Sequence, residues 1–395
     1  MTVHYELPTT TDFQALAGEH HPAITIYAST SPVVSERERA EVAVRSLFDE
    51  AFERLRASGA EPSEIDALRT EREAVLADKD IWSGLARSLA IFVAPGFSDV
   101  YVLPNRLDDA VHVGSHFTLG QLLRAPSQDQ EAFAVLLSSN EWTLWHAEPT
   151  ARAEQMPLDP NLPKNLEEAA NREPGDTGRR GGAGGHGDRG MSEEDRRPAN
   201  LDIYAKRVAD AVRQELQSHD PDERVPLFVF AAEPLLSSFL ERARNGRRVI
   251  PVQGGSDRLG SAEVDEELRR RLAELNVDEA KNALHRLADG SVGRVERDVA
   301  AIGHLAAEGA VETLWFDFTT SVNGTLDPES GAIEFATDNG NGEALHDGTH
   351  AGDLLPQLAM LVISKGGKVV TVRSDDLDES DWSGPVVAEL RFAMT

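Results

Sequence analysis

A glycine-rich stretch interrupts the hydrophobic patterning of this chain between Asn171 and Asn200. Six of the ten residues from Gly181 to Gly190 are glycine, so ordering the segment costs much backbone entropy. We therefore expect it to be mobile unless a partner binds it. Loops of this length are mostly functional or mere linkers, and a surface insertion that touches nothing is the competing interpretation.

Length, charge and cysteine content limit the classes of protein that fit. A chain of 395 residues predicts two or three domains, because one hydrophobic core rarely serves so many residues. No apolar window is long enough for a membrane span and the N-terminus lacks a signal peptide pattern, so we expect a soluble cytoplasmic protein without a membrane partner. The absence of cysteine excludes disulfides and thiolate chemistry. A net charge of −29 argues against DNA or general RNA binding and restricts any RNA contact to local basic patches.

Strand and helix patterns alternate in residues 1–127, which we interpret as a small α/β domain. We expect strands at residues 23–30, 88–96, 97–104 and 112–117, and helices at 35–58, 62–78 and 119–124. Ser35 is the predicted N-cap of the first helix and Gly59 its end. The continuous apolar run 88–96 predicts a central strand.

Residues 128–260 form the predicted middle domain, with the glycine-rich loop at 171–200. Two β-rich runs flank Ser139 and Asn140, a pattern typical of a hairpin. A helix at 201–218, a strand at 225–231, a helix at 234–244 and a strand at 248–252 follow. This order predicts a mixed sheet with helices packed on it, and of Trp142 and Trp145 we expect one in the core.

Residues 261–395 form the predicted third domain. We expect helices at 262–275, 277–289, 294–308 and 353–365, strands at 311–316, 368–372 and 386–392, and a loop insertion at 319–349 with a hairpin near 333–335. The alternation predicts a three-layer α/β/α sandwich.

Four stretches, taken in their order, resemble the archaeal and eukaryotic class-one release factor and Pelota family, and in particular the bacterial archaeo-eukaryotic release factors. The first is SLAIFVAPG at 88–96 with DVYVLPN at 99–105 and HFTLGQLL at 116–123. The second is FAVLLSSNEWTLWHAEP at 133–149, and the third is LDIYAKRVADAVRQEL at 201–216. The fourth is GAVETLWF at 309–316 with SKGGKVVTVRSDD at 364–376 and GPVVAELRF at 384–392.

The resemblance implies a three-domain architecture with an RNase H-like mixed sheet in the middle domain. It also implies a C-terminal α/β/α sandwich similar to kink-turn-binding ribosomal proteins. Such a molecule could fill a tRNA-sized space on the ribosome and direct its glycine loop at rRNA near the peptidyl-transferase centre. A translational GTPase is a further partner implied by the resemblance, and no cofactor is expected.

Two family motifs are missing from this sequence. Release factors carry Gly-Gly-Gln in the middle-domain loop, whereas here His186 follows Gly184 and Gly185 and the loop holds no glutamine. Histidine can act as a general base near neutral pH, but it lacks the paired donor and acceptor of an amide. The codon-reading Asn-Ile-Lys-Ser element is also absent, since residues 57–62 read ASGAEP. The resemblance therefore favours ribosome rescue, stress or hibernation over termination.

Local charge makes the glycine-rich loop a candidate RNA-binding site. Three arginines, Arg179, Arg180 and Arg189, stand against one acid, Asp188, between residues 178 and 190. Arginine on a flexible glycine backbone can approach phosphate closely and bond it in pairs. The predicted RNA-binding residues are Arg179, Arg180, Gly181, Gly182, Gly184, Gly185 and Arg189, and the predicted catalytic residue, if any, is His186.

Other clusters have simpler interpretations. His346 and His350 are spaced like metal ligands, but a third ligand and a rigid scaffold are missing from the pattern, so no metal site is expected. Gln253-Gly254-Gly255 reads as a turn. Arginines at 242, 244, 247 and 248 could meet rRNA or simply end a solvated helix.

Three functions remain open from the sequence. The first is a non-enzymatic ribosome-associated translation factor. The second is a peptidyl-tRNA hydrolase in which His186 replaces glutamine, and the third is an acidic stress-related protein without ribosome contact. Replacement of His186 by alanine separates the first two through peptide release, and cosedimentation with ribosomes separates both from the third.

Overall fold

The computed structural model describes residues 1–18, 20–149, 151–171, 193–243, 246–254, 259–290, 293–336, 352–377 and 382–393. The chain divides into two compact units. Unit 1 comprises residues 1–130, 149–151 and 271–395, and unit 2 comprises 131–148 and 152–270. Both are mixed α/β, as the sequence predicts. The three domains 1–127, 128–260 and 261–395 stay a prediction. Within the described ranges, no helix is long and apolar enough to cross a membrane.

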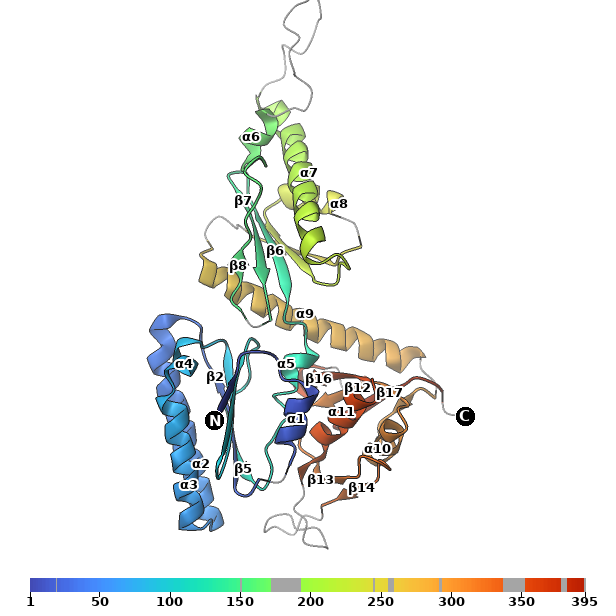
Figure 1. Ribbon diagram of the computed structural model, residues 1–395. Helices are drawn as coiled ribbons and strands as arrows, with labels where there is room; N and C mark the ends of the chain where they lie inside the picture. Colours follow the sequence, from blue (N-terminus) through green and yellow to red (C-terminus); the bar gives the residue numbers. More distant parts are fainter. Residues whose placement is uncertain are drawn as a thin grey trace, which may run out of the picture. The chain divides into compact units, whose positions relative to one another are not determined.

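A five-stranded sheet forms the N-terminal part of unit 1 (Figure 1). Its order is β1 (Thr2–His4), β4 (Phe97–Leu103), β3 (Ser88–Ala94), β2 (Ala23–Ser29) and β5 (Ala110–Gly114). The apolar strand β3 is central and buried at every residue, as predicted. Helices α2 (Arg37–Ser58) and α3 (Pro62–Ala77) cover one face, because α2 carries an apolar stripe that includes Val44, Phe48 and Leu55.

The other face of this sheet shares a hydrophobic core with the C-terminal part of the chain. Tyr27 and Phe92 from the sheet belong to the same buried cluster as Leu314 and Leu355. The short helices α1 (Thr10–Leu16) and α4 (Lys79–Ser83) also belong to unit 1. Residues far apart in the sequence therefore stabilise each other inside unit 1.

A second sheet of unit 1 has the order β11 (Val295–Glu296), β17 (Val386–Leu390), β12 (Val311–Asp317) and β16 (Lys368–Val372). One of its faces packs in the shared core with α10 (Val299–Ala307) and α11 (Leu354–Ser364). The opposite face, with Trp315 and Val387, packs on Leu284 and Leu287 of α9 (Ser261–Gly290). A small sheet of β14 (Ile333–Phe335), β13 (Asn323–Leu326) and β15 (Gly352–Asp353) completes the unit.

Unit 2 is built on a five-stranded mixed sheet. Its order is β10 (Val249–Gln253), β9 (Leu227–Ala231), β6 (Ala132–Leu137), β7 (Trp142–Ala147) and β8 (Glu154–Gln155). The first three strands are parallel, and the β6–β7 hairpin is antiparallel, as predicted. Helices α6 (Leu166–Asn171), α7 (Glu193–His219) and α8 (Leu235–Arg242) belong to this unit, and α7 and α8 pack on one face (Figure 1).

Several predicted elements are wrong in detail. α9 is one continuous helix rather than two, and the side chain of Asn276, at the predicted break, bonds the backbone of Asp129. Residues 120–123 form turns, and only Arg124–Ser127 are helical, as α5. Ser35 lies in the 3-10 turn η1 (Val34–Glu36) and does not cap α2.

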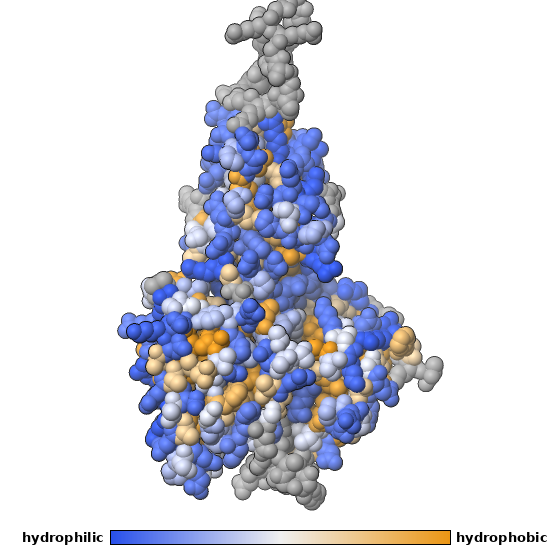
Figure 2. All heavy atoms as spheres, in the orientation of Figure 1, coloured by the Kyte–Doolittle hydropathy of each residue, from blue (hydrophilic) through white to orange (hydrophobic). Residues whose placement is uncertain are grey.

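The predicted placement of the two hairpin tryptophans is also wrong. Trp142 and Trp145 are only 5% and 7% exposed, although one was expected outside the core. The reason is that β6 and β9 are buried at every residue, so both faces of this sheet are covered. Hydrophilic residues dominate the visible surface in Figure 2, in line with the strong net charge.

Candidate functional site

The residues predicted to bind RNA lie outside the described residues. These are Arg179, Arg180, Gly181, Gly182, Gly184, Gly185 and Arg189, together with the candidate base His186. The structure instead describes the two helices that flank this segment in the chain. α6 ends at Asn171 and α7 begins at Glu193.

Helix α7 is held on unit 2 by an apolar stripe. Tyr204, Val208, Val212 and Leu216 recur at helical spacing and are all buried against the sheet. The helix begins eight residues before the predicted start at Leu201. A packed stripe of this length fixes the C-terminal flank of the glycine-rich segment.

Hydrogen bonds fasten α6 to α7. Arg207 of α7 donates from Nη1 to the carbonyl oxygen of Ala169 at 2.7 Å, and Ala169 is buried in the same core. At the start of α6, the side chain of Asn165 accepts from the backbone N–H of Glu168 at 2.9 Å, as an N-cap does. A cation at the last carbonyls of a helix is favourable. Both flanks of the segment are therefore anchored to one another.

Arg247 of the arginine cluster near α8 has a structural role and is not available for RNA in the way the sequence suggests. Arg247 Nη1 lies 2.6 Å from the Asp220 carboxylate, and the two side chains are 8% and 9% exposed. Arg242 pairs with Asp202 at 3.0 Å. Arg244 lies outside the described residues. Burial and pairing of Arg247 exclude both the rRNA and the solvated-helix interpretation for this residue.

The remaining sequence candidates contribute no site in the structure. His346 and His350 lie outside the described residues. Across the part of the chain that the structure describes, no group of three His, Asp or Glu side chains is arranged to hold a metal ion. Gln253 ends β10, Gly254 follows it, and Gly255 is outside the described ranges.

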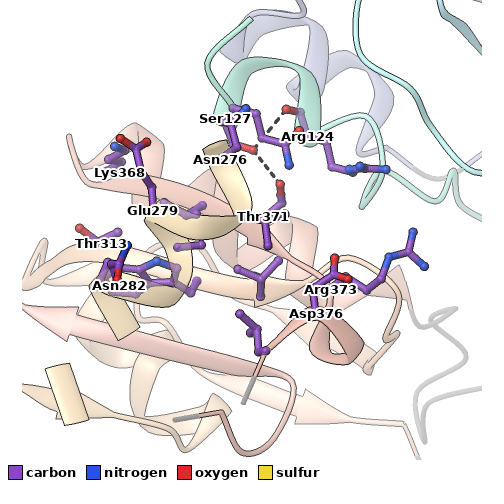
Figure 3. Close-up of a pocket in the computed structure, with 18 of the residues that line it drawn as sticks. Arg124, Ser127, Asn276, Glu279, Asn282, Thr313, Lys368, Thr371, Arg373 and Asp376 are labelled. Carbon is purple, nitrogen blue, oxygen red and sulfur yellow. Dashed lines mark hydrogen bonds between the residues drawn. The ribbon is translucent and has the colours of Figure 1, made fainter. Parts of the chain in front are cut away.

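A cavity of about 530 Å³ in unit 1 was not predicted from the sequence (Figure 3). It lies between the middle of α9, strands β12 and β16, and the end of α5. Two contacts hold these elements together. Asn276 bonds both the backbone N–H and the carbonyl of Asp129, at 3.1 and 3.0 Å, and the hydroxyls of Ser127 and Thr371 are 2.9 Å apart.

Two arginines reach one end of this cavity and share one aromatic ring. The guanidinium carbon of Arg124 lies 4.2 Å from the centroid of Phe318, and that of Arg373 lies 5.2 Å from it. Figure 3 shows both side chains extending toward the same side. Arg373 also bonds the carboxylate of Asp108. Burial lowers the pKa of Arg124 to about 10, with Arg373 adding to the effect while Asp108 and Asp376 oppose it.

No sequence pattern marks this cavity, because its residues come from five separate segments of the chain. Arg124 follows a short apolar run, Asn276 lies inside a charged helix, and Thr371 and Arg373 belong to an apolar strand and its end. Tertiary packing alone brings these segments together.

Comparison with known proteins finds a family model that matches the middle of the chain. Residues 133–310 match the family model described as bacterial archaeo-eukaryotic release factor family 3. This match begins at β6 and continues to the residue before β12, so it includes the glycine-rich segment with both flanking helices. No curated protein sequence matches the chain.

Solved structures of translation factors align with the chain at low similarity. A crystal structure of an archaeal translation termination factor is 13% identical over 97% of this chain and 96% of its own, with a TM-score of 0.24. A ribosome-bound archaeal Pelota is 14% identical over 81% and 75%, with a TM-score of 0.37. Dom34 of S. cerevisiae is 10% identical over 80% and 78%, with a TM-score of 0.34.

Scores at this level carry no argument about function, and the family assignment depends on the sequence match. That match covers the second and third of the four stretches on which the predicted resemblance was based, with the glycine-rich segment between them. The resemblance is therefore confirmed, because residues 133–310 match the model of bacterial archaeo-eukaryotic release factor family 3.

Proposed function

We propose that this protein is a ribosome-associated translation factor that acts in ribosome rescue, stress or hibernation rather than in stop-codon termination. The observation that carries the proposal is the family match over residues 133–310, which encloses the glycine-rich segment. In this proposal the protein works in the cytoplasm without a cofactor. The glycine-rich segment approaches rRNA near the peptidyl-transferase centre while the rest of the chain occupies a tRNA-sized space.

The finer fold assignments belong to the same proposal. The mixed sheet of unit 2 supports an RNase H-like middle domain, since three parallel strands continue into an antiparallel hairpin. The sheet of β11, β17, β12 and β16, with helices on both faces, supports a C-terminal sandwich of the kink-turn-binding type. A translational GTPase is the further partner that a three-domain factor of this kind suggests.

Termination is disfavoured by what the sequence contains at the two decisive motifs. Where the family places glutamine, this chain has His186, and residues 57–62 offer no lysine at the codon-reading position. A factor that keeps the fold but lacks both motifs can still occupy the ribosome. Ribosome rescue and hibernation require that the factor occupies the ribosome, but they do not require that it reads a stop codon.

The structure of the two flanking helices supports a role of the glycine-rich segment in binding rRNA at a narrow site. The Arg207 to Ala169 hydrogen bond and the buried stripe of α7 fix where the segment starts and ends. Because the two ends of the segment are already held close together, the segment loses less conformational entropy when it binds. The three arginines within the segment supply the local positive charge that an acidic chain needs for RNA contact.

Pelleting with 70S ribosomes through a sucrose cushion tests the proposal. The full chain is compared with a variant in which Arg179, Arg180 and Arg189 are serine, at low and at moderate salt. We expect the full chain to pellet and the variant to bind more weakly. The slope of the logarithm of the binding constant against the logarithm of the salt concentration should become shallower by roughly two to three in the variant. A variant with lysine at the same positions is the matched control and should keep most of the binding.

Two outcomes contradict the proposal. If the full chain does not pellet at any salt, the ribosome is not its partner and the acidic stress-protein alternative gains. If the serine and lysine variants pellet as the full chain does, another surface carries the contact and the role of the segment is wrong.

The alternative function is peptidyl-tRNA hydrolysis with His186 as the general base. It is favoured by one observation, namely that His186 follows Gly184 and Gly185 at the position of the family glutamine. Release of labelled peptide from ribosomes that carry peptidyl-tRNA separates the two functions. Hydrolysis predicts release that His186→Ala abolishes, whereas the non-enzymatic proposal predicts no release from either protein.

A further inference from the structure

Arg124 is a half-buried cation, and two of its hydrogen-bonding groups are left unused. Its Nε and Nη1 atoms are shielded from solvent and have no hydrogen-bond partner among the described residues. No carboxylate of the described chain lies within ion-pair distance of its guanidinium, and Asp108 is bonded to Arg373 instead. Donor groups of a cation that are shielded from water and lack a partner are unfavourable.

Phe318 compensates only part of this cost. The ring attracts the guanidinium above its face, but it offers no acceptor oxygen to the N–H groups of Arg124. The second cation over the same ring, Arg373, already takes up the carboxylate of Asp108. Asp376 lies close enough to oppose part of the lowering of the Arg124 pKa, but it makes no ion pair with Arg124.

A second unused donor lines the same cavity. Trp315 is 4% exposed, and its Nε1 has no hydrogen-bond partner in the described part of the chain. Three other buried tryptophans are satisfied, since the Nε1 groups of Trp82, Trp142 and Trp145 donate to Leu76, Pro163 and Thr143. Buried indole N–H groups usually find a partner, so this exception marks the cavity as incomplete.

We propose that this cavity binds the oxyanion group, phosphate or carboxylate, of a small molecule through Arg124 and Arg373, with Trp315 as a further donor. The planar fork of arginine suits both oxyanions, because either presents two oxygens to two N–H groups. A volume of about 530 Å³ leaves room for the rest of a molecule the size of a mononucleotide. Acids also line the cavity, including Glu279 and Glu389, and they favour a ligand that offers hydroxyl or amino donors away from its oxyanion.

Isothermal titration calorimetry on the full chain tests this site. The probes are inorganic phosphate, adenosine 5′-monophosphate and citrate at constant ionic strength, with uncharged adenosine as the reference. We expect at least one anion to bind with a Kd below about 1 mM and adenosine to bind at least roughly tenfold more weakly. Phosphate or the nucleotide identifies a phosphate ligand, whereas citrate alone identifies a carboxylate.

Variants assign the binding to the cavity. Arg124→Met keeps the apolar stem on Phe318 but removes the donors, and it should weaken binding roughly tenfold or more. Trp315→Phe keeps most of the packing and should weaken it severalfold. Arg45→Met is the matched control, because Arg45 is exposed, pairs with Glu41 on α2 and does not line the cavity.

The Tm of the unliganded protein distinguishes a ligand-binding role of Arg124 from a structural one. If the cation serves a ligand, Arg124→Met leaves this Tm unchanged or raises it, because an uncompensated charge is removed. If Arg124 stabilises the fold, the same substitution lowers the Tm. The proposal is overturned if no anion binds at millimolar concentration, if Arg124→Met binds anions as the full chain does, or if adenosine binds as tightly as its monophosphate.

Discussion

Arg247 and Asp220 form an ion pair in unit 2 whose side chains are both almost fully enclosed. Besides the 2.6 Å contact, Arg247 donates to the carbonyl oxygens of Val225 and Asp220 at 2.7 and 3.0 Å. Asp220 also accepts from the backbone N–H of Val225 at 2.8 Å. The pair therefore ties the loop after α7 to the start of β10.

Removal of Arg247 should destabilise unit 2. Arg247→Ala leaves the Asp220 carboxylate buried without its cation, so we expect the free energy of unfolding to fall by about 3–5 kcal/mol. Urea denaturation followed by circular dichroism measures the change. Arg224→Ala is the control, since Arg224 pairs with Asp222 at the surface and its side chain is 82% exposed. An equal loss in both variants would show that burial of the pair does not matter.

Asp317 makes the stability of unit 1 dependent on pH. Burial raises the pKa of its carboxyl, but hydrogen bonds from Thr319, Ser374 and Thr320 outweigh burial and hold the pKa below its ordinary value. The N–H and hydroxyl of Thr319 donate at 2.8 and 2.6 Å. A carboxyl with a lowered folded pKa stabilises the protein above its unfolded pKa, and this contribution is lost as the pH falls through the folded pKa.

We expect the free energy of unfolding to decrease as the pH is lowered from about 5 to about 3, since unfolded aspartate titrates near 3.9. Asp317→Asn should reduce the dependence of the free energy of unfolding on pH, and it should also lower that free energy at pH 7. Urea denaturation at pH 7, 5, 4 and 3 compares the two proteins. Identical slopes in both would mean that other carboxyls account for the acid sensitivity.

At the scale of elements, α10 and the turn before β14 meet through two glycines. A Cβ atom at Gly303 would lie 2.4 Å from the carbonyl oxygen of Gly331, and one at Gly331 would lie 2.1 Å from that of Gly303. Gly331 also has a positive φ of 71°. The close approach of two backbones explains why a helix interior here contains glycine despite its poor helix propensity.

Gly303→Ala should therefore destabilise the protein, by about 1–3 kcal/mol, even though alanine is the better helix former. The added Cβ atom would clash with the backbone at Gly331, and this clash can be relieved only if the whole turn shifts. Chemical denaturation measures the loss. Gly114→Ala is the matched control, since its added Cβ would meet nothing closer than 4.0 Å, and it should stay within about 0.5 kcal/mol of the parent. Equal effects at both positions would contradict the packing argument.

At the scale of the whole molecule, each of the hydrophobic clusters found among the described residues lies within one unit. The core of unit 2 surrounds α7 and α8, and the cores of unit 1 surround its own sheets. The division between the units falls within α9, whose residues up to Arg270 belong to unit 2. Separate cores favour separate unfolding, because cooperativity is carried by shared buried contacts.

Differential scanning calorimetry should consequently resolve two transitions. Arg247→Ala should lower the Tm of one transition, and Gly303→Ala should lower the Tm of the other. A single transition that both variants shift equally would show that the continuous α9 couples the units into one cooperative system.

Local pattern in the sequence determined the elements whose residues carry their own signal. The apolar run of β3, the helical stripe of α7 and the hairpin of β6 and β7 were all predicted because each depends on spacing within one short segment. The resemblance to the release factor family also came from short motifs, and residues 133–310 match a family model. The glycine-rich segment was also evident from composition alone, although its residues lie outside the described structure.

Only the tertiary structure decided what depends on contacts between distant segments. It made α9 continuous, buried both Trp142 and Trp145, and turned Arg247 from a candidate RNA contact into a buried partner of Asp220. It also brought Arg124, Trp315 and Arg373 to one cavity across about 250 positions of sequence. The physical reason is that burial and charge compensation depend on which side chains meet in space, and a one-dimensional pattern records only which residues are neighbours along the chain.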